Sequence, residues 1–99
     1  IEIQSLKIAV RDLNDQDISS RNLNKKTKGV VITEISNRSP LANLLNVNDI
    51  IIEVQKTSVK NSSDLNKIVD SIFKKGEKTL LLTIINNTNR RRYIGVKIN

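Results

Sequence analysis

The sequence contains neither cysteine nor histidine, and these two absences exclude most self-contained catalytic chemistry. Without cysteine the chain can form neither a disulfide framework nor a thiolate metal site. Without histidine it lacks the usual general base, the most common metal ligand and any Ser-His-Asp arrangement. We therefore expect no catalytic residue, no metal site and no cofactor in this chain.

Aromatic side chains, methionine and long apolar runs are also scarce or absent. No apolar segment approaches the ~18 residues that a membrane-spanning helix needs. Phe73 and Tyr93 are the only aromatic residues, so the sequence offers no platform on which nucleic-acid bases could stack. The chain has no Met and begins Ile-Glu-Ile, from which we expect it to be a piece of a longer protein.

The remaining composition is that of one globular domain with a basic surface. The chain has 99 residues, of which 37% are hydrophobic and 27% charged, and its formal net charge is +7. Lys and Arg gather at 25–28, 74–78 and 90–92, where we expect loops and element ends. We interpret them as solvated surface charge and expect no specific nucleic-acid partner, although a weak anionic partner stays open.

Two short β-branched runs form the centre of the predicted fold. Residues 29–35 and 50–54 are too apolar for a surface ribbon and are predicted to be buried strands. Between them, Ser39 can cap a short helix with Pro40 at its first position, and we expect Leu41, Leu44 and Leu45 to face inward. Asn48 tolerates a left-handed backbone. Asp49 is interpreted as a turn residue and not as a catalytic carboxylate.

The flanking segments complete a mostly β pattern. Apolar and polar residues alternate over 5–10, which predicts a half-buried strand, and residues 1–4 are either the end of a linker or an edge strand. Cap-forming residues predict helices over about 14–23 and 61–75. Residues 79–85 and 91–98 form a closing hairpin. Because Gln55-Lys56 is not an Asn-Gly pair, we expect a loose turn there.

Three signals in this order resemble a bacterial PDZ domain of the Do/HtrA-like serine proteases, in particular the C-terminal one. They are Gly29 before an apolar strand, then Ser39-Pro40-Leu41-Ala42, then Asn48-Asp49-Ile50-Ile51. The resemblance covers nearly the whole chain. It implies a single PDZ domain over residues 1–99, mainly β with two helices (α+β), built as a partly open β-barrel of five or six strands capped by helices.

The same resemblance implies a peptide-binding groove. An extended peptide would add as a strand to the edge of residues 8–10, and its C-terminal carboxylate would lie on backbone N–H groups of the preceding loop. Lys7 stands where the family has Gly, so either the loop is ordinary or the anion site is weakened. Ile68 and Phe73 would go to the core. The implied peptide-binding residues are Leu6, Lys7, Ile8, Ala9, Val10, Leu65, Val69 and Ile72.

The implied function is binding and not bond cleavage. The chain would be a non-catalytic module of a periplasmic serine endopeptidase in protein quality control, with polypeptide substrates or protein C-termini, the protease domain and other subunits as partners. Membrane insertion is not expected. Two alternatives stay open, namely a scaffold or oligomerisation domain that binds no peptide, and a weak nucleic-acid-binding basic module.

Overall fold

One antiparallel sheet with two helices makes up the computed structural model, which describes residues 1–98. The strands follow the order β1-β2-β3-β4-β6-β7, and β5 pairs with β4. Their bounds are β1 (Glu2–Ile3), β2 (Ile8–Asp12), β3 (Val30–Ile35), β4 (Ile50–Val54), β5 (Thr57–Ser58), β6 (Thr79–Ile85) and β7 (Arg91–Lys97). The predicted α+β class is confirmed. The sheet has seven strands where five or six were expected. Two of the seven, β1 and β5, have only two residues each and are easily missed in a sequence pattern.

The central strands β3 and β4 lie where the β-branched runs predicted them. Val30 pairs with Ile51, and Val31 pairs with Ile50. Gly29 precedes this pairing because the strands approach each other closely there. A Cβ atom at this position would lie 2.5 Å from the carbonyl oxygen of Ile51, so any other side chain would push the backbone apart. Asn48, just before β4, has the expected left-handed backbone, with φ of 79°.

The first helix, α1 (Asp15–Ser20), begins with a complete capping box. The Asn14 side chain accepts a bond from the Asp17 backbone N–H, and the Asp17 carboxylate accepts one from the Asn14 N–H, each at 2.9 Å. Both terminal nitrogens of the Arg11 guanidinium also donate to the Asp17 carboxylate, at 2.7 Å, and link α1 to β2. The helix ends at Ser20, three residues before the predicted end at Leu23.

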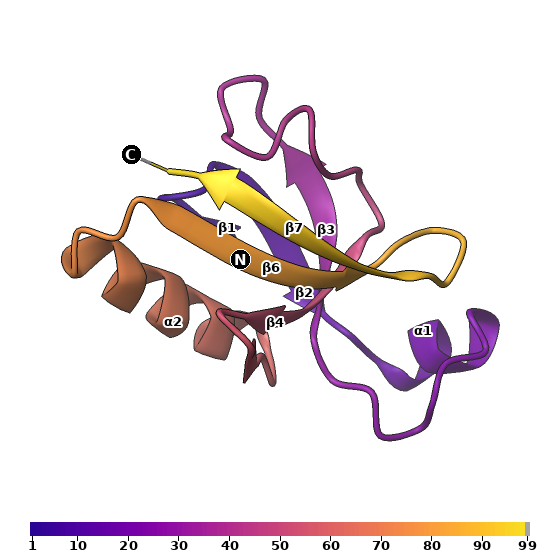
Figure 1. The fold of residues 1–99 in the computed structure, drawn as a ribbon. Helices are drawn as coiled ribbons and strands as arrows, with labels where there is room; N and C mark the ends of the chain where they lie inside the picture. Colours follow the sequence, from indigo (N-terminus) through magenta and orange to yellow (C-terminus); the bar gives the residue numbers. More distant parts are fainter. Residues whose placement is uncertain (99) are drawn as a thin grey trace.

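The second helix, α2 (Ser62–Lys74), matches its prediction closely. Its N-cap is Asn61, whose side chain accepts a bond of 2.8 Å from the Asp64 N–H. Gly76 follows the C-cap with a left-handed φ of 73°, a common way for a helix to end. Figure 1 shows α2 and α1 at opposite ends of the molecule, with the twisted β6–β7 hairpin running between them.

Alternating side chains divide the apolar residues between the two faces of the sheet. The larger cluster lies between the sheet and α2 and includes Val30, Ile32 and Ile51 together with the apolar residues of α2. The smaller cluster, on the other face, consists of Val31, Ile50 and Ile52, with Leu13, Leu23 and Ile85 packed against it. The structure therefore buries both faces of β3 and β4, as their continuous apolar character predicts.

Two local predictions are wrong. Residues 40–44 form turns instead of a short helix, and Leu44 is 46% exposed while Leu41 and Leu45 are buried. Gln55 and Lys56 form a tight two-residue turn, with φ of 51° and 63°. The Gln55 side chain explains this turn, because it donates to the carbonyl of Thr79 and accepts from the N–H of Leu81, which fixes the turn to β6.

Candidate functional site

The two predicted walls of the groove lie together in the structure. Leu6, Ile8 and Val10 come from the loop before β2 and from β2 itself, and Leu65, Val69 and Ile72 come from α2. All six belong to the larger apolar cluster, and none is more than 7% exposed. The other two predicted residues point elsewhere: Lys7 is exposed and Ala9 half-buried, and both line a surface hollow with Glu2 and Glu34.

The loop before β2 has at Lys7 a left-handed backbone conformation, which glycine adopts more easily than other residues. Lys7 has a φ of 55°. Its carbonyl accepts a bond of 3.0 Å from the Ser36 N–H, and the Leu6 carbonyl accepts a bond from the Ser39 hydroxyl. The turn after β3 thus holds the loop in place. Of the two alternatives left open by the sequence, an ordinary loop conformation is excluded.

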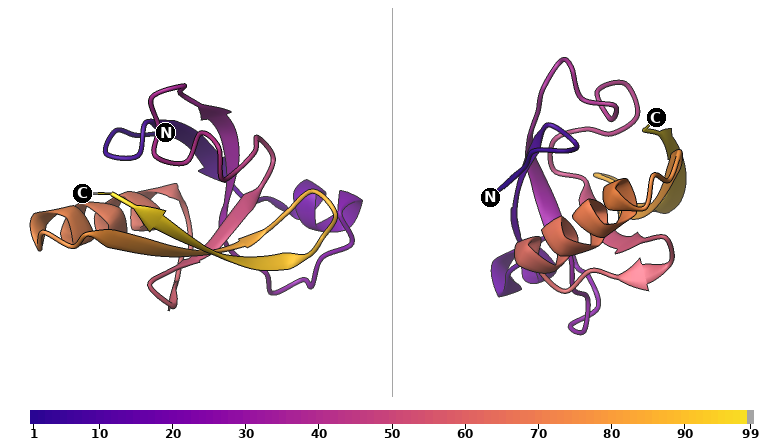
Figure 2. Two further views of the ribbon diagram at one scale, coloured as in Figure 1. Left: turned by 45° about the horizontal axis from the view of Figure 1, so that its top comes forward. Right: turned by 90° about the vertical axis from the view of Figure 1, so that its left-hand side faces the viewer.

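The outer edge of β2 is already paired by the first residues of the chain. Residues 1–4 run antiparallel to β2, with Glu2 opposite Ala9 and Ile3 opposite Ile8. Figure 2 shows this N-terminal segment beside β2, at the edge of the sheet. Ile3 is fully buried, which stabilises the arrangement by ~1.5–3 kcal/mol. Of the two readings of residues 1–4, the edge strand is confirmed.

Asp12 holds the two walls together at the far end of the site. It ends β2, and its Oδ1 accepts bonds from the backbone N–H of Ser62 at 2.7 Å and from the Ser62 hydroxyl at 2.6 Å. These bonds lower the pKa of the Asp12 carboxyl group. Ser62 is the first residue of α2, where the helix dipole also favours a negative charge. Sequence reasoning missed this contact because 50 residues separate the partners.

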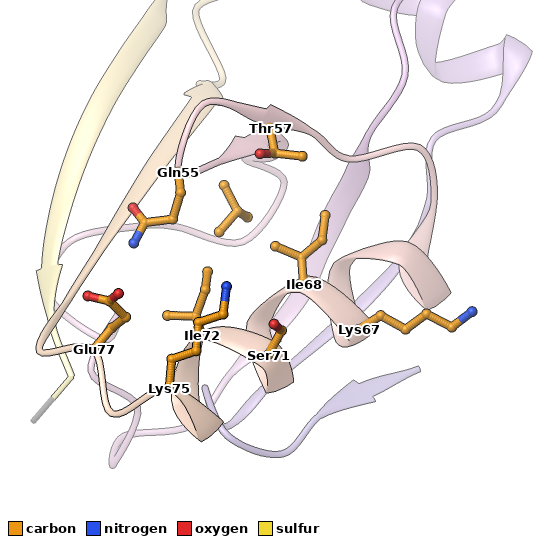
Figure 3. A pocket seen from close by; sticks show the side chains of 9 residues that line it. Gln55, Thr57, Lys67, Ile68, Ser71, Ile72, Lys75 and Glu77 are labelled. Atoms are coloured by element: carbon orange, nitrogen blue, oxygen red, sulfur yellow. The ribbon is translucent and has the colours of Figure 1, made fainter.

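A separate pocket of about 480 Å³ lies between α2 and the turn that joins β4 to β5, as Figure 3 shows. Ile68 and Ile72 form its apolar floor, and it is bordered by the side chains of Lys67, Lys75 and Gln55. Ile68 and Phe73 were predicted to lie in the core. They are only half-buried at its border, because they project from α2 beside the stripe formed by Leu65, Val69 and Ile72.

Within residues 1–98, no three His, Cys, Asp or Glu side chains are grouped so that they could hold a metal ion. None of the helices in the same residues has the length and apolar character needed to cross a bilayer.

Sequence comparison relates the chain to bacterial proteases. No model of a known protein family matches it. Probable periplasmic serine endoproteases described as DegP-like, from Brucella suis and Brucella abortus, are 33% identical to it over 73 residues. This match covers 73% of the present chain but only 14% of the length of either relative.

Structural comparison identifies the fold. The PDZ domain of HtrA3 bound to a phage-derived ligand, FGRWV, matches 94% of this chain and 80% of its own, with a TM-score of 0.69 and 20% identity. The HtrA-type protease AlgW with a decapeptide matches 93% of this chain and 27% of its own, with a TM-score of 0.69 and 16% identity. The PDZ domain of EpsC from Vibrio cholerae covers 93% and 94%, with a TM-score of 0.57 and 8% identity.

Proposed function

Because this chain has the fold of a PDZ domain, a non-catalytic module, we propose that it binds extended polypeptide segments, above all C-terminal segments that end in an apolar residue. The bound segment would add as a strand to the outer edge of β2. Its terminal side chain would pack between β2 and α2, among Leu6, Ile8, Val69 and Ile72, and its carboxylate would lie against the loop that contains Lys7.

The observation that carries this proposal is the pairing of β2 with a short strand. The β2 edge forms regular antiparallel bonds with residues 1–3, and an apolar side chain of that segment, Ile3, is buried in the cluster between β2 and α2. This pairing supports two requirements of strand addition: a β2 edge that accepts an antiparallel strand, and an apolar cluster beside it that buries one side chain of that strand. The HtrA3 domain and AlgW are described with peptides, which supports the same use of this fold here.

The proposal extends to the protein in which the module works. Similarity to DegP-like endoproteases supports a place for residues 1–99, as a single domain, in a periplasmic serine protease. There the module would present misfolded or unassembled polypeptides to the protease domain, or help to set the number of subunits. Purification of the protein that contains this segment, with an assay of its cleavage of unfolded casein and of its mass in solution, tests this part.

Peptide binding is tested by titration with FGRWV and with the same peptide carrying a C-terminal amide. We expect the free acid to bind with a Kd from about 1 to several hundred μM, which is about 5–8 kcal/mol. The amide should bind at least about tenfold more weakly, since hydrogen bonds to charged groups contribute about 1.5–3 kcal/mol. Equal binding of acid and amide would exclude carboxylate recognition, and absence of binding by both would overturn the proposed function.

A scaffold role without peptide binding is the second candidate, and the occupied edge of β2 favours it. A domain whose groove is filled by its own chain could serve only to contact neighbouring subunits. Sedimentation of the isolated chain over a range of concentrations tests this alternative. Concentration-dependent association without any response to FGRWV is the result expected of a scaffold.

A further inference from the structure

We infer that residues 1–4, called the N-terminal strap below, occupy the peptide-binding edge intramolecularly, and that a peptide binds only when the strap is displaced. This inference rests on the proposed function and names what controls the same site. Three features of the strap support it: its direction, its use of the loop amides, and the burial of one side chain.

The strap runs in the direction that a bound C-terminal peptide must take. It is antiparallel to β2, and its C-terminal end enters the loop at Lys7. A peptide that pairs with β2 and has its carboxylate at this loop must run the same way. The Val10 N–H donates to the carbonyl of Ile1 at 2.8 Å, and the terminal amino group of Ile1 donates to the carbonyl of Val10 at 3.0 Å. Strap and peptide therefore compete for the same backbone groups.

The strap also takes the loop amides that a carboxylate would need. The Leu6 N–H donates to the carbonyl of Ile3 at 3.1 Å, and the Lys7 N–H donates to the carbonyl of Gln4 at 3.2 Å. These distances lie at the long end of the usual range for such bonds. A charged carboxylate forms shorter and stronger bonds with the same donors. A peptide C-terminus can thus replace the two neutral carbonyls.

One side chain of the strap fills the apolar part of the site. Ile3 has no exposed surface and belongs to the same cluster as Ile8 and Val69, whereas Glu2 and Gln4 on either side are exposed. This alternation is what a bound extended peptide shows when one residue anchors it. Ile3 therefore takes the place that the apolar anchor of a peptide would occupy.

The strap is short enough to be displaced. Its strand has two residues, lies at the edge of the sheet and pairs only with β2, and isolated two-stranded hairpins are at best marginally stable. Because a tethered segment has an effective concentration in the millimolar range, it competes well with a dilute peptide. If the site is open in one molecule of ten, the apparent affinity for a peptide falls about tenfold.

An engineered disulfide can lock the strap without altering the core. Glu2 and Ala9 face each other as a non-hydrogen-bonded pair, because the neighbouring residues Ile1 and Val10 exchange both of their bonds. Side chains at such pairs are close enough for a disulfide, and neither residue is buried. Since the chain has no natural cysteine, Glu2→Cys with Ala9→Cys creates a single possible bridge.

The test is titration of FGRWV against this double variant, oxidised and reduced. We expect the oxidised form to bind at least about tenfold more weakly than the reduced form of the same double variant, a difference of about 1.4 kcal/mol or more. The single variant Glu2→Cys, under both redox conditions, controls for the reagents. A second pair of variants tests the effect of weakening the strap. Ile3→Ala should tighten peptide binding several-fold, whereas Ile1→Ala, at a 65% exposed position, should not.

The outcomes separate this inference from the proposed function. Equal affinity of the oxidised and reduced forms overturns the strap inference and leaves peptide binding intact. Absence of binding by every form, including the unmodified chain, overturns the proposed function and the strap inference together. Thermal unfolding of the oxidised form, with a transition as cooperative as that of the reduced form, ensures that a loss of binding comes from the lock and not from misfolding.

Discussion

Lys7 adopts a left-handed backbone conformation that costs a residue with a Cβ roughly 1–2 kcal/mol. Glycine adopts it without this strain but loses more freedom on folding. We expect Lys7→Gly to raise the free energy of unfolding by about 0.5–1 kcal/mol, the net of these terms. Denaturant unfolding of the unmodified chain and of Lys7→Gly measures this change in the free energy of unfolding. Lys7→Ala is the matched control: it removes the same charge but keeps the Cβ atom, and an equal gain in both variants would contradict the backbone explanation.

Asp12 makes a second residue-scale prediction, because its carboxylate joins β2 to the start of α2. Removal of the side chain in Asp12→Ala should lower stability at neutral pH by about 1 kcal/mol, given that the group is largely exposed and its bonds are weakened by solvent. Because the folded-state pKa is depressed, the contribution is complete above the unfolded pKa of about 4 and disappears as pH falls through the lower folded value.

The pH dependence distinguishes the carboxylate from a simple packing effect. Unfolding of the unmodified chain and of Asp12→Ala is to be compared between neutral pH and about pH 2–3, where carboxyl groups with ordinary pKa values are protonated. The difference should shrink toward the acid end. A difference that stays constant over this range would show that the charge of Asp12 does not contribute. Measurements on Ser62→Ala, alone and combined with Asp12→Ala, complete a double-mutant cycle that gives the interaction energy between Asp12 and Ser62.

At the scale of elements, the sequence predicted what depends on local pattern. The strands β3 and β4, the helix α2 and the closing hairpin follow from alternation, caps and helical periodicity, so their positions could be read within a few residues. The tight turn at Gln55 could not, because bonds to Thr79 and Leu81 stabilise it from across the sheet. For the same reason, the local sequence pattern could not predict that residues 1–3 pair with β2 or that Asp12 contacts Ser62.

The exposure of Leu44 gives an element-scale prediction with a matched control. Leu65, on the inner face of α2, is fully buried, while Leu44 lies 46% exposed in the turns that replace the expected short helix. Leu65→Ala should therefore cost about 2–5 kcal/mol of stability, and Leu44→Ala less than about 0.5 kcal/mol. Denaturant midpoints of the two variants provide the measurement. Comparable losses would show that the turn after β3 packs inward, as the sequence alone suggested.

The molecule as a whole carries a formal net charge of +7. The basic residues at 25–28, 74–78 and 90–92 lie in loops, at the end of α2 and at the start of β7, and Lys26, Lys28 and Arg91 line one surface hollow. We expect any association with nucleic acid to be independent of base sequence and to weaken steeply between about 50 and 200 mM salt, since counterion release would drive it. Filter binding at both salt concentrations checks this. Sequence-selective binding at the higher salt would favour the basic-module alternative.

The central claim, that the space between β2 and α2 receives a peptide strand, is tested most directly by recording the backbone amide signals of the labelled chain while FGRWV is added. The account predicts that the signals of residues 6–10 and 65–72 shift, and that those of residues 1–4 move toward positions typical of an unpaired segment. Shifts confined to the pocket between α2 and the β4–β5 turn, around Gln55 and Lys75, would contradict it. So would an unchanged spectrum at about 1 mM peptide, which places any binding at less than about 4 kcal/mol.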